Sequence, residues 1–191
     1  MQGFDLAAIL SNPDFRAMIW LGIRMTATVA IGSWLLAMAL AIVLLTIRLT
    51  PSVIAQRCVA AYVSYHRNVP TLVQLMLWYF GISNLLPDAV QECLSDHDGE
   101  AIFAVIALGL CQAAFFSEDM RSGLRAVSAG QAEAARALGH SYVGSMRYVI
   151  LPQAIRNAIP ALVNHTVGIV TLTGPGERDG PGQVWWHEEA A

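Results

Sequence analysis

The chain has 191 residues, of which 55% are hydrophobic and 13% are charged, where a charged share of about 25% is ordinary for a soluble domain. Much of the surface must therefore face something other than water, which predicts a membrane protein. The net charge of −3 gives no indication of nucleic-acid binding. Three scattered cysteines, Cys58, Cys93 and Cys111, are too few for a disulfide framework or a thiolate metal site.

Long uncharged stretches predict an all-α, polytopic bundle of about four transmembrane helices. A helix needs roughly 20 residues to cross the hydrocarbon layer, and continuous apolar runs without alternation exclude a β-barrel. We expect spans over about 20–47, 58–87, 99–120 and 157–173. An external segment (1–19), a cytoplasmic loop (121–156) and an atypical polar tail (174–191) complete the predicted organisation. The fourth span contains Pro160 and His165.

The charged residues between the spans predict the orientation, because arginine favours cytoplasmic loops near membrane ends. Segment 48–67 holds three arginines and no acid, whereas segment 88–100 holds five acids and no arginine. Segment 118–156 again has an excess of arginine, five against three acids. This alternation places the N-terminus in the periplasm, segment 88–100 outside and segment 118–156 inside.

The cytoplasmic segment contains a predicted short helix over 126–138, which is rich in alanine and is followed by Gly139 as a C-cap. Ala134, Ala135 and Leu138 are spaced to form a short apolar ridge. A helix of this length is marginal by itself, because nucleation is costly. It must pack on something, and the pattern leaves open whether that is the chain's own helices or a partner.

The same segment carries a motif with a fixed spacing. Glu133-Ala134-Ala135 is followed after three residues by Gly139, and after nine further residues by Val149-Ile150-Leu151-Pro152. This pattern resembles the EAA motif of ABC-importer permeases, with Val149 in the place where isoleucine is usual. The match in residue type and spacing lies within the loop that the charges place in the cytoplasm.

A second resemblance lies upstream. Arg67-Asn68-Val69-Pro70 and Leu72-Val73-Gln74-Leu75 are similar to the second-helix signature of polar amino acid permeases, the histidine, glutamine and glutamate/aspartate permease family. The Arg-Asn-Val-Pro form and Leu85-Leu86-Pro87 are most similar to a glutamate/aspartate importer subunit. The resemblance extends from about residue 22 to about residue 166.

The resemblance implies a type I permease fold and a subunit of an ABC importer in the bacterial inner membrane. Such a chain binds no cofactor and is not an enzyme, since ATP is used by a partner subunit. The implied partners are that ATP-binding subunit, a second permease subunit of the same or a different kind, a periplasmic amino-acid-binding protein and the lipid bilayer. The EAA segment would form a coupling helix in a groove of the ATP-binding subunit. Its implied contact residues are Glu133, Ala134, Ala135, Leu138, Gly139, Val149, Leu151 and Pro152.

Arg67 is the candidate substrate contact that the resemblance implies, with Asn68 and Gln74 as nearby polar groups. An acidic amino acid carries a surplus negative charge, and the planar guanidinium of arginine matches a carboxylate. The competing interpretation makes Arg67 an anchor beside the lipid headgroups, and the sequence leaves both open. Asn164 and His165 are further polar residues at predicted membrane depth, where they serve either function or hydrogen bonding between helices.

Other kinds of site are not indicated. The histidines form no i, i+4 pair that would favour a metal site, and no G-x-S-x-G elbow is present. The Gly-Pro-Gly runs after residue 173 lack the Lys-Ser/Thr of a phosphate loop. Glu118 and Asp119, at the inner end of the third span, are expected to be solvated or paired with Arg121.

The end of the chain departs from the family pattern. The resemblance implies a fifth helix after the fourth span, yet segment 174–182 has no helical pattern. We therefore expect that helix to be missing, through truncation, a frameshift or divergence to a short form. The alternatives to a working permease are a non-transporting remnant of one, a small intramembrane enzyme or a non-ABC channel.

Overall fold

The protein is described by a computed structural model that covers residues 13–87, 90–92 and 99–173. Within these ranges the chain is helical and contains no strand, which confirms the predicted all-α fold. Residues 1–12 of the predicted external segment, much of the acidic segment 88–100, and the tail 174–191 lie outside the described residues. The expectation of a missing fifth helix rests on that tail.

The helices follow one another with short connections. The α-helices are α2 (Pro13–Arg48), α3 (Val53–Asn68), α4 (Thr71–Met76), α6 (Gly99–Arg125), α7 (Ala129–Ala137), α8 (Tyr142–Ser145) and α9 (Leu151–Thr173). The π-helical turn η1 (Leu77–Ile82) and the 3-10 turn η2 (Ser83–Leu85) extend α4. A second π-helical turn, η3 (Met146–Ile150), precedes α9.

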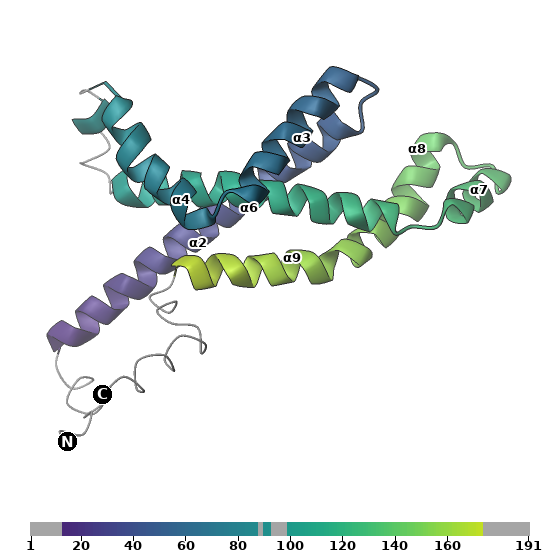
Figure 1. Cartoon of the computed structure of the whole chain (residues 1–191). Helices are drawn as coiled ribbons and strands as arrows, with labels where there is room; N and C mark the ends of the chain where they lie inside the picture. Colours follow the sequence, from purple (N-terminus) through teal and green to yellow (C-terminus); the bar gives the residue numbers. More distant parts are fainter. Residues whose placement is uncertain (1–12, 88–89, 93–98, 174–191) are drawn as a thin grey trace, which may run out of the picture.

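Helix α6 is the centre of the bundle (Figure 1). It packs against α2 and α9, and it also contacts α3 and α4. Helices α7 and α8 lie together at the opposite end of the molecule from α4. The segment predicted to be cytoplasmic therefore extends away from the helices that form the core.

Two helices, α2 and α6, are long and apolar enough to cross a membrane. They include the predicted spans 20–47 and 99–120, and each is longer than its span. α2 begins inside the predicted external segment, and α6 continues into the predicted loop. α9 includes the predicted span 157–173 and begins before it, but α9 does not pass the same test of length and hydropathy. Its crossing of the membrane stays a prediction.

The second predicted span, 58–87, is wrong as one continuous helix. α3 ends at Asn68, Val69 is extended with a ψ of 125°, and α4 begins at Thr71. Pro70 is the physical reason, because its ring removes a backbone donor and disfavours helical geometry at the residue before it. The remaining apolar helix, Thr71–Ile82, is short of the roughly 20 residues that a crossing needs.

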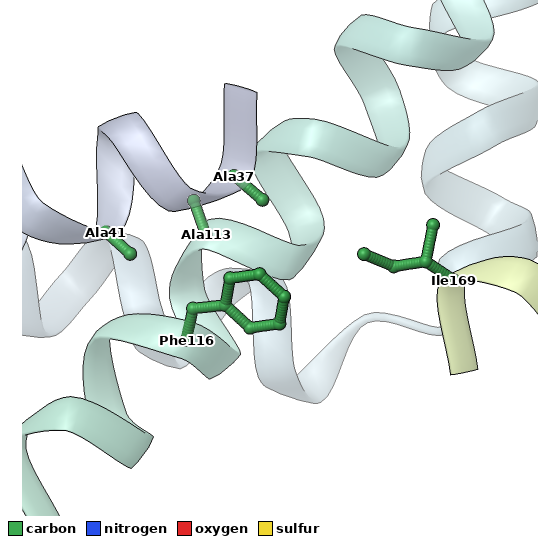
Figure 2. Packing of buried hydrophobic residues seen from close by; sticks show 5 residues of the cluster. All are labelled: Ala37, Ala41, Ala113, Phe116 and Ile169. Carbon is green, nitrogen blue, oxygen red and sulfur yellow. The ribbon is translucent and has the colours of Figure 1, made fainter. Parts of the chain in front are cut away.

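Small residues let the three long helices approach closely. Ala37 and Ala41 of α2, Ala113 and Phe116 of α6 and Ile169 of α9 form one buried cluster (Figure 2). Membrane helices commonly associate through such small side chains, because lipid offers them no hydrophobic driving force. Close approach of the helix backbones therefore contributes to the packing of this bundle, alongside large buried side chains.

The contact between α6 and α9 requires a glycine. A Cβ atom on Gly123 would lie 2.5 Å from the carbonyl oxygen of Ala154 and 2.8 Å from the Cβ of Ala158. Neither neighbour can rotate away, since one is backbone and the other a methyl group fixed to it. The helices therefore meet at a distance that only a residue without a side chain allows.

The outer faces of the bundle are apolar. Trp20 and Ile31 on α2 and Val163, Val167 and Val170 on α9 expose large hydrophobic side chains. A contiguous apolar exterior of this kind marks a surface that contacts lipid or other protein. The inside of the bundle, by contrast, holds several polar side chains, among them His66 and Gln74, which pair with each other.

Candidate functional site

The predicted coupling helix is present as α7, bounded by Ala129 and Ala137 and so shorter than the predicted 126–138. Its end is set by Gly139, which has a φ of +83°. The N–H of Gly139 donates to the carbonyl of Arg136 at 2.9 Å, and that of His140 donates to the carbonyl of Ala135 at 3.1 Å. These two bonds form a Schellman motif. The prediction that Gly139 ends the helix is confirmed.

The three residues of the predicted ridge lie in different environments, so the prediction of one shared face is wrong. Ala135 is buried with 2% of its surface exposed, whereas Leu138 is 82% exposed and Ala134 is exposed as well. Helix α7 packs on α8 and η3, and Ala135 is its buried residue. The structure thus assigns Ala135 to packing within the chain and leaves Ala134 and Leu138 available on the surface.

The second half of the motif joins α7 to the start of α9. Val149 is half-buried in η3, Leu151 is exposed, and Pro152 lies where η3 continues into α9. The side chain of Gln153 donates to Gln131 Oε1 at 3.2 Å, which connects the beginning of α9 to α7. Glu133 is exposed on α7, and within the described ranges it forms no ion pair.

The predicted pathway residues do not share one site. Arg67 is exposed, and its guanidinium carbon lies 5.7 Å from the centroid of the Phe115 ring. Asn68 is also exposed, and its side-chain amide donates to the carbonyl of Ser64 at 2.6 Å within α3. Gln74 is buried with 2% exposure. Of the three residues, only Arg67 is charged, and its guanidinium lies against a side chain of α6.

A polar cluster joins Arg67 to α9. The ring of Phe115 lies 5.0 Å from that of His165, and His165 Nδ1 is 2.7 Å from Asp119 Oδ2. Arg67, Phe115, His165 and Asp119 thus form a continuous row across α3, α6 and α9, which we call the Arg67–Asp119 row. Sequence reasoning noted His165 and Asp119 separately and missed their pairing, because they are 46 residues apart. A histidine and an acid in neighbouring apolar stretches were the available signal.

A second ionic cluster connects the ends of α2 and α6. Glu118 pairs with Arg48, the last residue of α2, and with Arg121 at 3.6 Å. The expected pairing of Glu118 with Arg121 is confirmed, while the partner of Asp119 is His165 instead of Arg121 or solvent. Both side chains of the Arg48–Glu118 pair are largely shielded, so the pair fixes the relative position of the two helix ends.

The described residues offer no cluster that would hold a metal ion, and the lining of one cavity between α2 and α9 does not include the pathway residues. No group of three or more histidines, cysteines or acids converges in these ranges. A cavity of about 170 Å³ lies between α2 and α9, and its walls are almost entirely apolar. Its lining comprises Ala30, Ile31, Trp34, Thr166, Ile169 and Val170. The indole of Trp34 donates to Thr166 Oγ1 at 3.0 Å and so bridges the two helices beside it.

A helical bundle with an apolar exterior, paired charges inside and an exposed EAA helix defines a transport protein of the permease class. The family described as "Binding-protein-dependent transport system inner membrane component" matches residues 49–177. This match covers more than half of the chain, and the protein belongs to this family. The family is a transport component without enzymatic activity, so the predictions of a permease and of a non-enzyme are confirmed.

Individual relatives are amino-acid permeases. The chain is 41% identical over 112 residues to the "Probable amino-acid permease protein YxeN" of Bacillus subtilis, covering 59% of this chain and 47% of that one. It is 39% identical over 122 residues to the "Arginine transport system permease protein ArtQ" of the same organism, covering 61% and 52%. It is 29% identical over 167 residues to the "Glutamate/aspartate import permease protein GltJ" of Escherichia coli K12, covering 85% and 68%.

A solved structure described as "Crystal structure of an amino acid ABC transporter with histidines" has the same fold. It matches with a TM-score of 0.71 and 28% sequence identity, covering 86% of this chain and 73% of that one. The chain spans about half the length of the first two relatives above. The likeness therefore extends from the sequence motif to the arrangement of the helices.

Proposed function

We propose that this chain is the membrane-spanning subunit of an ABC importer that carries a polar amino acid across the bacterial inner membrane. The observation that carries the proposal is the family match over 49–177, which includes both the upstream signature and the EAA segment. The named functions of the relatives are amino-acid transport throughout. The comparisons do not favour a non-transporting remnant, an intramembrane enzyme or a non-ABC channel.

In this proposal the partner subunit hydrolyses ATP, and α7 receives the resulting motion. Leu138 and Ala134 are exposed on α7, and Glu133 presents a free carboxylate beside them. An exposed leucine next to small residues suits a close-fitting groove in a protein partner. A second permease subunit and a periplasmic binding protein complete the assembly. The arginine-rich segments face the cytoplasm, which places the N-terminus in the periplasm.

The substrate class is drawn from the charges of the Arg67–Asp119 row. The relatives carry arginine, glutamine or glutamate and aspartate, so their names agree on a polar amino acid and differ in its charge. Arg67 is held over the ring of Phe115, a contact that is attractive for a guanidinium. Such an arginine supplies a planar partner for a carboxylate, which supports glutamate or aspartate as the substrate. The orientation toward α6 also supports a pathway role over that of a lipid anchor.

The test is uptake by the importer assembled with its ATP-binding and substrate-binding partners. Arg67→Lys keeps the charge and removes the planar fork, so glutamate uptake should fall about tenfold relative to glutamine uptake, since a charged hydrogen bond contributes roughly 1.5–3 kcal/mol. Arg57→Lys is the matched control, because Arg57 is exposed on the same helix. Equal glutamate-to-glutamine ratios in parent and Arg67→Lys would rule out the binding role.

A further inference from the structure

We infer that Gln74 is a positioning residue, whose side-chain amide replaces the backbone donor that Pro70 lacks and thereby fixes the end of α3. The inference rests on the proposed function in one respect, namely that Arg67 at this end serves the transport pathway. Gln74 itself does not contact the substrate. The inference therefore changes the role that the sequence resemblance implies for this residue.

The break at Pro70 leaves a specific backbone group without its usual partner. In a continuous helix the N–H of residue 70 would donate to the carbonyl of His66. Proline has no N–H, and an unpaired carbonyl inside a membrane protein is costly. Gln74 Nε2 instead donates to the His66 carbonyl at 3.0 Å and to the Val69 carbonyl at 2.8 Å. One side-chain amide thus satisfies two carbonyls at the break.

The side-chain oxygen of Gln74 also has a hydrogen-bonding partner. Gln74 Oε1 lies 2.6 Å from His66 Nδ1, and both side chains are buried. The two amide hydrogens and the oxygen of Gln74 therefore all have partners within the chain. With 2% of its surface exposed and these partners in place, Gln74 has no donor left for a ligand.

Side chains on both sides of the break also contact one turn of α6. Tyr62 Oη donates to the carbonyl of Leu110 at 2.7 Å, just before the break. Thr71 Oγ1 lies 3.6 Å from Cys111 Sγ, just after it. Cys111 Sγ also lies 3.9 Å from the His66 carbonyl, so the thiol meets the same oxygen as the amide of Gln74. The buried Cys111 is therefore packed directly against the break between α3 and α4, which we call the α3–α4 joint.

This arrangement links Gln74 to Arg67 through the backbone. Arg67 follows His66, whose carbonyl and ring are both bonded to Gln74. Loss of these bonds frees the last turn of α3 and with it the direction of the Arg67 side chain toward Phe115. A residue that acts in this way changes the preference set by Arg67 only when the break between α3 and α4 opens, whereas a residue that contacts the substrate changes the preference while the break stays closed.

Cys111 provides a readout that does not depend on transport. In the full chain carrying Cys58→Ser and Cys93→Ser, Cys111 is the remaining thiol, and N-ethylmaleimide should modify it slowly. Gln74→Met has a similar length without the amide, and it should make Cys111 react about tenfold faster because the buried joint loses its partners. In the assembled importer the same substitution should lower glutamate uptake relative to glutamine uptake, as Arg67→Lys does, because Arg67 loses its fixed direction toward Phe115. Asn68→Leu, which removes an amide bonded only within α3, is the matched control and should leave Cys111 protected.

A second variant tests whether the result with Gln74→Met reflects misfolding of that variant. Gln74→Glu keeps the shape and removes the two donors, so it should also expose Cys111 while the protein stays monodisperse. Protection of Cys111 in both variants, or an altered glutamate-to-glutamine ratio with Cys111 still protected, would overturn the inference. If Arg67→Lys leaves substrate preference unchanged, the proposed role of Arg67 fails, whereas the reactivity of Cys111 still decides whether Gln74 holds the joint.

Discussion

The contact between α6 and α9 and the helix α7 are built from the same kinds of residue with opposite results. Both regions are rich in glycine and alanine. At the first, Gly123, Ala154 and Ala158 are buried, and the two backbones touch. On α7 most of the alanines are exposed, and Ala135 is its buried residue. Small residues thus serve close packing within the chain in one region and leave an open surface in the other.

This difference shows that burial, rather than residue type, determines what a substitution will disturb. A larger side chain at the α6–α9 contact must separate two helices, because the atoms it meets belong to the backbone or to a methyl group. A larger side chain on the open face of α7 meets solvent, or a partner when one is bound. Folding and partner binding should therefore respond to different substitutions, and the two regions can be tested separately.

The largest effect on the unfolding temperature of the bundle is expected from Gly123→Val at the α6–α9 contact. Overpacking of a tight site costs roughly 1–3 kcal/mol, which for a chain of this size lowers the unfolding temperature by about 3–10 °C. Thermal unfolding in detergent measures it. Gly22→Val on α2 is the control, since a Cβ atom there meets nothing within 4 Å, and it should unfold near the parent temperature. Equal temperatures for both variants would contradict the close contact.

An intermediate effect is expected from Ala135→Asp on α7. The new carboxylate would be buried against α8 and η3 without a partner, which costs several kcal/mol locally. Because α7 lies at the periphery, we expect loss of α7 rather than global unfolding. Faster proteolysis between residues 126 and 140, with an unchanged unfolding temperature of the bundle, is the expected measurement.

Leu138→Asp is the matched substitution on the exposed side of the same helix. Leu138 is 82% exposed, so the carboxylate remains in water and proteolysis of α7 should stay at the parent rate. Co-purification of the ATP-binding subunit should nevertheless be lost, because the docked leucine would be replaced by an unpaired charge. Normal recovery of the complex with Leu138→Asp would refute docking through this face.

The smallest effect on the protein is expected from cysteine labelling, which compares the two regions without disturbing either. In a background without the native cysteines, Ser128→Cys lies at the exposed start of α7, and Ser117→Cys lies buried in α6. A thiol reagent that cannot cross the membrane should label position 128 in inverted vesicles and not in intact cells. Position 117 should stay unlabelled in both. Labelling of position 128 in intact cells would reverse the proposed orientation.

The sequence by itself determined the features that depend on local chemistry. Its composition and uncharged stretches indicated a helical membrane protein, and the spacing of the EAA motif indicated the family. Gly139 was identified as the end of α7 because a positive φ is a property of the residue's own backbone. The break at Pro70 is also accessible in principle, since a missing N–H is a local fact, although the apolar stretch around it predicts one continuous span.

Only the tertiary structure decided which residues meet and which face outward. The pairing of His165 with Asp119 and of Arg48 with Glu118 joins residues that are 46 and 70 positions apart. The separation of Ala135 from Leu138 depends on where η3 and α8 return to α7. The amide of Gln74 points to the break rather than to the pathway because Pro70 leaves a carbonyl that needs a donor. Each outcome is set by the packing of separate helices, which the order of residues along one helix does not specify.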